Sequence, residues 1–161
     1  MTEQSTPITV AHPPAAALRV VNPILRVLLR APVVSSVAKD MMVLRFRGRK
    51  TGRQYSIPLS AHQLDNQLYA LTGAPWKQNF RDGAAAEVLH CGKTTTRHGE
   101  LISDRPVVAD LFYRCAQSYG AKRAQRMMGL KFGGQRLPTL SDFTRAVEDN
   151  HLAAIRLTSS G

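Results

Sequence analysis

Apolar and polar residues alternate along the middle of the chain in a way that predicts β-structure. Every second residue from Met42 to Phe46 is large and apolar, and a period of two returns over residues 54–59. Because successive side chains of a strand point to opposite faces of a sheet, this spacing predicts two strands with one buried face each. Residues 48–52 lie between them and are bounded by glycines, which predicts a tight hairpin turn.

Further segments extend this sheet and add helices. Strands are predicted at 68–72, 86–90, 94–102 and 152–157, with turns at Asp65-Asn66 and Gly92 and a helical turn over 76–81. Apolar spacings of three and four predict a helix over 14–31, or two short helices divided at Asn22-Pro23. A second helix is predicted from residue 105, interrupted at Gly120 and followed by a helical piece to Met128, and Ser141 is a candidate cap for one reaching Val147. The apolar face expected on the second helix consists of Val108, Leu111, Phe112, Cys115 and Tyr119. Residues 129–138 are expected to form a loop. Hairpin-linked strands are antiparallel, and a sheet of five or six curls into a barrel to hide its edges.

The length of the chain suits one domain with one core. We expect residues 1–13 to form a flexible leader and residues 14–161 to form a single domain. No signal-peptide pattern or bilayer-spanning apolar run is present, and Cys91 and Cys115 form no CxxC pair. A reducing, cytoplasmic setting is therefore the default.

The charge of the chain indicates an anionic partner. Lys and Arg total 22 against 11 Asp and Glu, a formal net charge of +11. Such a balance attracts nucleic acid, anionic membrane or phosphate-bearing small molecules. Arg19, Arg26 and Arg30 lie within the first predicted helix, which either rests on the inner face of a membrane or packs across a barrel end with its arginines solvated. Nucleic acid is disfavoured because no recognition motif is present and aromatic residues make up 6% of the chain.

Two segments are candidates for chemistry. In the first, residues 48–53, glycines allow a tight turn while Arg49, Lys50 and Arg53 supply cations and Thr51 a hydroxyl donor, a combination that suits phosphate. The alternative is an exposed hairpin tip. In the second, residues 73–81, the single tryptophan Trp76 is suited to wall an aromatic ring, and a nearby asparagine offers a donor and an acceptor. The alternative is that Trp76 plugs a barrel end and the asparagine caps local backbone.

Other catalytic signatures are missing from the sequence. The five histidines show no HxxxH spacing, so no metal site is expected, and neither GxSxG nor a strand-linked GxGxxG occurs. Cys91 and Cys115 are better suited to a turn and a core than to nucleophilic attack. If the protein is an enzyme, a cofactor supplies the reactivity and no side chain is expected to be catalytic.

Taken together, the two segments resemble the deazaflavin-dependent nitroreductase family, part of the flavin/deazaflavin oxidoreductase superfamily of split β-barrels. Members typically show a strand ending in GRKSG or GRKTG, a proline six residues after its last glycine, and then WxxNLR. The corresponding positions here are residues 48–52, Pro58 and residues 76–81. The likeness is clear over residues 22–101 and continues loosely to Leu157.

The resemblance implies a fold, a cofactor and a set of contacts. The fold would be mainly β with α, an FMN-binding-like split β-barrel with helices flanking the barrel. The cofactor would be coenzyme F-420, a deazaflavin whose phosphate and oligoglutamate tail account for the clustered cations. Carried over residue by residue, the cofactor contacts are Arg49, Lys50, Thr51, Gly52, Arg53, Pro58, Thr72, Trp76 and Asn79, and the substrate contacts are Tyr113 and Tyr119.

The implied activity is transfer of a hydride from the reduced deazaflavin to a small-molecule acceptor: a quinone, an enone or a nitroaromatic. The chain departs from the family in two places: Tyr55 stands where relatives often have a second arginine, and the loop between Thr72 and Trp76 is shorter. FMN is therefore an alternative cofactor. A non-catalytic protein of the same fold that holds a fatty acid, haem or FMN is the alternative function, and both a monomer and a homodimer are compatible with the sequence.

Overall fold

The computed structural model describes residues 7–10, 39–134 and 136–159. They belong to two compact units, one containing residues 7–10, 71–74, 102–134 and 136–154 and the other residues 39–70, 75–101 and 155–159. The helix predicted over 14–31 lies outside the described residues.

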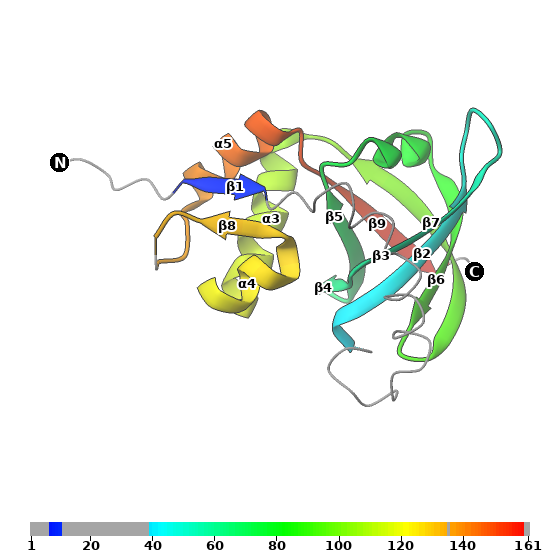
Figure 1. Ribbon diagram of the computed structural model, residues 1–161, viewed down its shortest axis with the longest axis horizontal. Coiled ribbons are helices and arrows are strands. Elements are labelled where there is room, and N and C mark those ends of the chain that lie inside the picture. The colour runs from blue at the N-terminus through cyan, green and yellow to red at the C-terminus, as the bar shows by residue number, and fades with distance from the viewer. Residues whose placement is uncertain (1–6, 11–38, 135, 160–161) are drawn as a thin grey trace, which may run out of the picture. The chain divides into compact units, whose positions relative to one another are not determined.

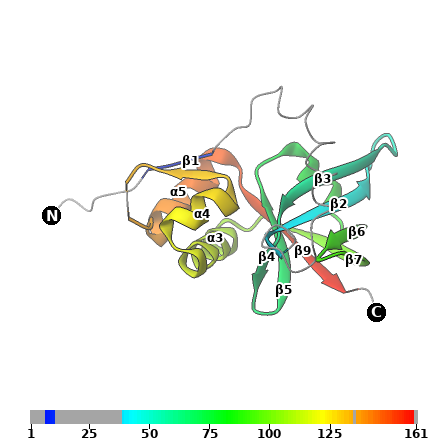
Figure 2. The ribbon, with the colours of Figure 1, turned by 60° about the horizontal axis from the view of Figure 1, so that its bottom comes forward.

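A seven-stranded sheet forms the barrel (Figures 1 and 2). Its strands are β2 (Met41–Arg47), β3 (Gln54–Ser60), β4 (His62–Leu64), β5 (Gln67–Thr72), β6 (Ala84–His90), β7 (Lys93–Ile102) and β9 (Ala153–Ser159), in the order β3-β2-β6-β7-β9-β5-β4. The two ends of that order, β3 and β4, are separated in the chain only by Ala61. The sheet must therefore curl back on itself, and the predicted split β-barrel is confirmed.

Hairpin turns determine the register of the sheet. β2 pairs antiparallel with β3 from Met41 opposite Ser60 to Arg47 opposite Gln54. The β4–β5 hairpin turns through Asp65 and Asn66, where the sequence predicted a turn, and both residues have positive φ. Two residues of positive φ match the strand twist in a two-residue turn, a conformation that glycine, asparagine and aspartate tolerate best. β4 itself is a three-residue strand that the sequence pattern missed.

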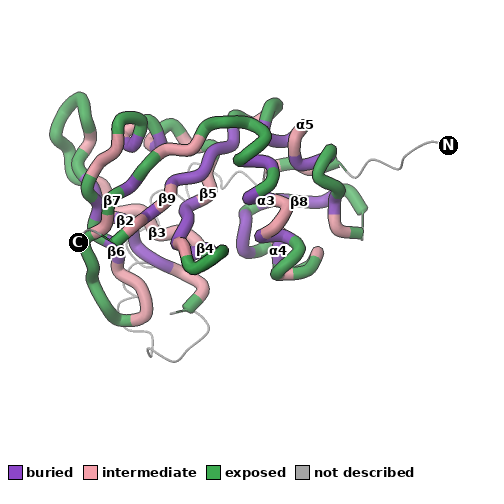
Figure 3. The backbone as a smooth tube through the Cα atoms, turned by 180° about the vertical axis from the view of Figure 1, so that it is seen from behind, coloured by how far each residue is buried: buried purple, intermediate pink, exposed green. Residues whose placement is uncertain are grey.

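The inner face of the barrel holds its core. Met42, Leu44 and Phe46 of β2 are buried there, together with Ala86 and Val88 of β6. Figure 3 shows the burial along the strands. Inward residues at every second position bury apolar area at roughly 25 cal/mol per Å², which is the main force that holds such a sheet curled.

The other unit contains three α-helices and a two-stranded sheet within the described residues. The helices are α3 (Arg105–Tyr119), α4 (Ala121–Met128) and α5 (Leu140–Asn150), and β1 (Ile8–Val10) pairs antiparallel with β8 (Leu130–Phe132). The predicted apolar face of α3 is buried at Val108, Leu111, Phe112 and Cys115, while Tyr119 is only half-buried. No helix in the described ranges is long and apolar enough to cross a bilayer.

Three expectations for this unit differ from the structure. Strand β1 lies inside the range expected to be a leader, and β8 lies inside the expected loop 129–138. The strands are three residues each and stabilise one another by long-range pairing, which a local pattern does not reveal. Helix α5 is capped by Thr139 in place of Ser141, because Thr139 and Asp142 form a reciprocal capping box.

Candidate functional site

The basic turn between β2 and β3 is closed by main-chain hydrogen bonds. Gly48 N donates to Arg53 O over 2.8 Å, and Gly52 N donates to Gly48 O over 3.0 Å. Gly52 has a φ of 69°, a left-handed conformation that glycine adopts without strain. The closed backbone leaves the side chains of Arg49 and Lys50 exposed at the tip of the hairpin.

Asn79 joins this turn to the tryptophan segment, which forms the 3-10 helix η2 (Pro75–Phe80). Arg49 N donates to Asn79 Oδ1 over 2.8 Å, and Asn79 Nδ2 donates to Trp76 O over 2.8 Å. The Arg49 guanidinium also donates to Gln78 O over 3.3 Å. The Asn79 amide therefore uses both its oxygen and its nitrogen to hold the two motifs together.

An aromatic cluster lies behind the turn. The Phe46 ring stacks on Tyr55 with centroids 5.2 Å apart, and it contacts Phe80 at 4.9 Å in an edge-on arrangement and Trp76 at 5.6 Å. Phe80 is fully buried, whereas Trp76 and Tyr55 are half-buried and pack against the core. The sequence left open that Trp76 serves only to plug the barrel end. The indole does pack against the core, but it also lines a surface hollow.

The turn and η2 together line this hollow, which has a volume of about 900 Å³. Five residues that the family resemblance implied as cofactor contacts lie on its wall: Arg49, Lys50, Thr51, Trp76 and Asn79. The remaining lining residues were not in the predicted set: Gly48, Tyr55, Pro75, Gln78 and Arg81. All of them lie in or beside the two motifs, so their closeness to those motifs in the sequence is the signal that could have identified them.

Three predicted contacts of the same unit do not line the hollow. Gly52 closes the turn, and Arg53 is exposed beyond it with its main-chain N–H donating to Thr51 Oγ1 over 3.3 Å. Pro58 lies on β3 opposite Val43 of β2. These three residues contribute to the structure of the hairpin, and their contact with a ligand stays a prediction.

The other predicted contacts belong to the helical unit. The Thr72 hydroxyl accepts a hydrogen bond from Ala74 N over 2.9 Å. The Tyr113 ring lies 6.1 Å from that of Phe143, and the guanidinium carbon of Arg123 lies 5.2 Å from the centre of the Tyr119 ring. These contacts are internal to that unit, and the substrate roles of both tyrosines stay predictions.

The hollow is electropositive. Arg49, Lys50 and Arg81 line it, and none of its lining residues is acidic. Asp82 lies 3.3 Å from the Arg49 guanidinium, but both side chains are largely exposed, so this pair is weak and open to replacement by a stronger anion. Burial lowers the pKa of Lys77 on η2, which does not line the hollow. Among the described residues, no three His, Cys, Asp or Glu side chains are placed to share a metal ion.

The residues present fit a ligand with a phosphate and a flat ring. Guanidinium and ammonium groups form charge-assisted hydrogen bonds to phosphate oxygens. The exposed faces of Tyr55 and Trp76 offer apolar surface for a ring, and the volume of the hollow is that of a cofactor site. These features also suit FMN, since a phosphate and a planar ring are common to both cofactors.

Comparison with known proteins gives only distant structural likeness. No protein-family model and no curated protein matches the chain. Among solved structures, the chain is similar to the conserved hypothetical protein Rv2991 from Mycobacterium tuberculosis, at 16% identity and a TM-score of 0.48 over 82% of this chain and 85% of that one. It is also similar to a candidate 5-nitroimidazole antibiotic resistance protein from Bacteroides thetaiotaomicron VPI-5482, at 12% identity and a TM-score of 0.40 over 98% of this chain and 86% of that one. Likeness at this distance says nothing about activity.

Proposed function

We propose that the protein binds a phosphate-bearing deazaflavin, coenzyme F-420, in the hollow beside the basic turn and acts as a reductase of small electron-poor molecules. The observation that supports this most directly is the hydrogen bond from Arg49 N to Asn79 Oδ1. It brings the cations of the turn and the indole of Trp76 to one hollow. A bare hairpin tip would need no such connection to a segment thirty residues away.

The residues of the hollow have separable tasks in this proposal. Arg49, Lys50 and Arg81 neutralise the anionic part of the ligand, and the Thr51 hydroxyl adds a donor. Tyr55 and Trp76 hold the ring and keep water from one of its faces. Asn79 acts as a positioning residue, because its amide is engaged with Arg49 and Trp76.

The chemistry that a reduced deazaflavin supplies when bound is hydride donation to a quinone, an enone or a nitroaromatic. The lining residues include no carboxylate, imidazole or thiol to act as a strong acid or base. The protein therefore contributes orientation, charge neutralisation and partial exclusion of water.

The test is a fluorescence titration, because Trp76 is the single tryptophan of the chain and lines the hollow. We expect F-420 to quench its emission and to bind more tightly than FMN, and we expect menadione to reoxidise the reduced complex. Arg49→Ala/Lys50→Ala should weaken binding about tenfold or more, since each charge-assisted bond is worth roughly 1–3 kcal/mol. The control Lys93→Gln/Arg145→Gln removes the same charge from exposed positions outside the hollow.

Three outcomes separate the possibilities. Equal loss of affinity in both double variants would show non-specific attraction and reject the site. Tight FMN binding without F-420 binding would keep the site and replace the cofactor. Tight binding of either cofactor without reoxidation by any acceptor would favour the non-catalytic binding protein of this fold.

A further inference from the structure

The strands β2 and β6 pair over a short length and then separate. They are neighbours in the sheet, but their register covers only Val43 opposite Leu89, Leu44 opposite Val88 and Arg45 opposite Glu87. By contrast, β2 pairs with β3 over seven positions, and β6 pairs with β7 over the seven positions from Ala84 to His90. Beyond Arg45 and Glu87 the two strands thus form a fork, which we define as the space between residues 46–47 of β2 and residues 84–86 of β6.

A buried phenylalanine lies beneath this fork. Phe80 is fully buried, its ring lies 4.9 Å from that of Phe46 on β2, and a Cβ added to Gly99 of β7 would stand 2.5 Å from its Cδ1 atom. Gly99 is the partner of Ala84 on β6. The Phe80 ring thus fills the inner side of the sheet where the strands separate, and the small side chains of residues 84–86 leave the outer side open.

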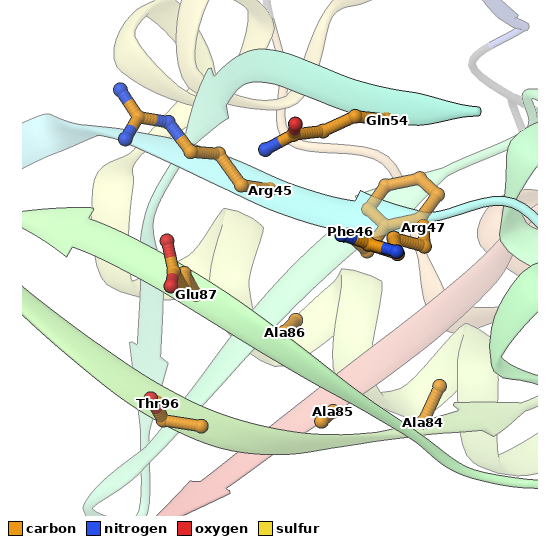
Figure 4. A pocket seen from close by; sticks show the side chains of 9 residues that line it. All are labelled: Arg45, Phe46, Arg47, Gln54, Ala84, Ala85, Ala86, Glu87 and Thr96. Atoms are coloured by element: carbon orange, nitrogen blue, oxygen red, sulfur yellow. The ribbon is translucent and has the colours of Figure 1, made fainter. Parts of the chain in front are cut away.

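The open side is a hollow of about 530 Å³ (Figure 4). Phe46 and the three alanines of β6 contribute its apolar lining; Ala85 is exposed, while Phe46 and Ala86 reach it only with the 5% and 3% of their surface that is accessible. Polar side chains surround it: Arg45, Arg47 and Gln54 from β2 and β3, and Glu87 and Thr96 from β6 and β7. Arg45 and Glu87 are direct neighbours in the register, yet no ion pair joins them among the residues that the structure describes.

The hollow shares no lining residue with the one beside the basic turn. The two are separated by the stacked rings of Phe46, which lines the fork, and Tyr55, which lines the other hollow. A ring seated in the fork would therefore face Phe46 and would not replace a ligand held by Arg49 and Lys50.

We propose that the fork is a second binding site and that its ligand is a small aromatic carboxylate. The ring of the ligand lies against the apolar lining at the opening between the strands, and its carboxylate is held by the guanidinium groups of Arg45 and Arg47. Two arginines beside an apolar lining match this class, because a guanidinium binds a carboxylate through paired hydrogen bonds while the lining takes the uncharged ring. Glu87 on the opposite side disfavours ligands with more than one negative charge.

Isothermal titration calorimetry of the full chain with 2-naphthoate tests the proposal. We expect a binding event that persists in Arg49→Ala/Lys50→Ala, and binding about tenfold weaker for the neutral analogue 2-naphthalenemethanol, which cannot form the charge-assisted bonds. Arg45→Gln/Arg47→Gln should weaken 2-naphthoate to a similar extent. Ala85→Phe keeps both arginines but fills the exposed hollow, and it should also weaken binding about tenfold or more.

The controls separate this site from general attraction to a basic protein. Lys93→Gln/Arg145→Gln removes two exposed cations elsewhere and should leave the affinity within about twofold, as should Arg49→Ala/Lys50→Ala in the other hollow. The absence of binding, an equal loss in the Lys93/Arg145 variant, or full binding in Ala85→Phe would each overturn the proposal. Loss of binding in the Arg49/Lys50 variant alone would instead assign the probe to the hollow beside the basic turn and overturn a separate site.

Discussion

The main-chain N–H of Arg49 lies 2.8 Å from the side-chain oxygen of Asn79, although thirty residues separate them in the chain. The same Asn79 amide donates to Trp76 O, so one side chain holds the phosphate-binding candidate against the ring-binding candidate. The Arg49 guanidinium itself makes a 3.3 Å hydrogen bond to Gln78 O and an exposed ion pair with Asp82, weak contacts that a stronger anion can replace.

Replacing this amide tests its positioning role. Asn79→Ala removes both bonds and should cost about 1–3 kcal/mol of stability and weaken phosphate-ligand binding about tenfold. Asn79→Asp keeps the acceptor for Arg49 N but loses the donor to Trp76 O, so it should recover part of the stability, while its negative charge in the hollow should still weaken binding of a phosphate ligand. Thermal unfolding and Trp76 quenching measure the two effects. Gln63→Ala, at an exposed position on β4, should change neither; an Asn79→Ala protein with parental affinity would contradict the role.

The close approach of β7 to Phe80 predicts strong coupling between two residues. Gly99→Ala places a Cβ 2.5 Å from the Phe80 ring and should destabilise the protein by about 1–3 kcal/mol through overpacking. Phe80→Leu should destabilise it alone by leaving a cavity, yet the combined variant should lose less than the sum because the smaller side chain accommodates the methyl group. Urea unfolding of the parent, the two single variants and the double variant measures the coupling. Strictly additive losses of stability would show that the Phe80 ring does not restrict the size of the side chain at residue 99.

Acid should destabilise the protein through His62 on β4. Burial lowers the pKa of His62 to about 4, whereas an exposed histidine titrates near 6.5. The unfolded chain therefore takes up a proton that the folded chain refuses, and stability falls as the pH drops from 6.5 to 4, by about 3 kcal/mol in total. Unfolding free energies measured across this range should show a smaller loss for His62→Gln than for the parent, while exposed His98→Gln should follow the parent.

The two cysteines should differ in reactivity. Cys115 is buried in α3, and burial raises its pKa to about 11, so little thiolate is present at neutral pH. Cys91 is half-buried at the β6–β7 turn. Iodoacetamide at pH 8 should modify Cys91 first, as judged by peptide mass spectrometry, and both residues should react equally fast in guanidinium chloride. Early modification of Cys115 in the folded protein would contradict its burial.

The sequence predicted those elements whose signals are local. The strands β2 and β3 follow from the alternation of apolar and polar side chains. The turns at Asp65-Asn66 and Cys91-Gly92 follow from the aspartate, asparagine and glycine in them, which are the residue types that tolerate positive φ best. The short strands β1 and β8 were missed, because three residues carry too little pattern and each strand depends on its distant partner. For the candidate site, the two motifs could be named from their residue types, but Tyr55 and Arg81 were not expected on its wall.

By itself, then, the sequence determined the hairpin-linked antiparallel strands, the tight glycine-bounded turn and the positive charge concentrated there, since strand periodicity, backbone freedom and charge are properties of neighbouring residues. Only the tertiary structure decided that Asn79 joins the turn to Trp76 and that β2 and β6 separate beyond Arg45 and Glu87. Both features arise from contacts between residues about thirty or more positions apart. Such contacts depend on how the whole sheet closes around Phe46 and Phe80, and no local pattern encodes that geometry.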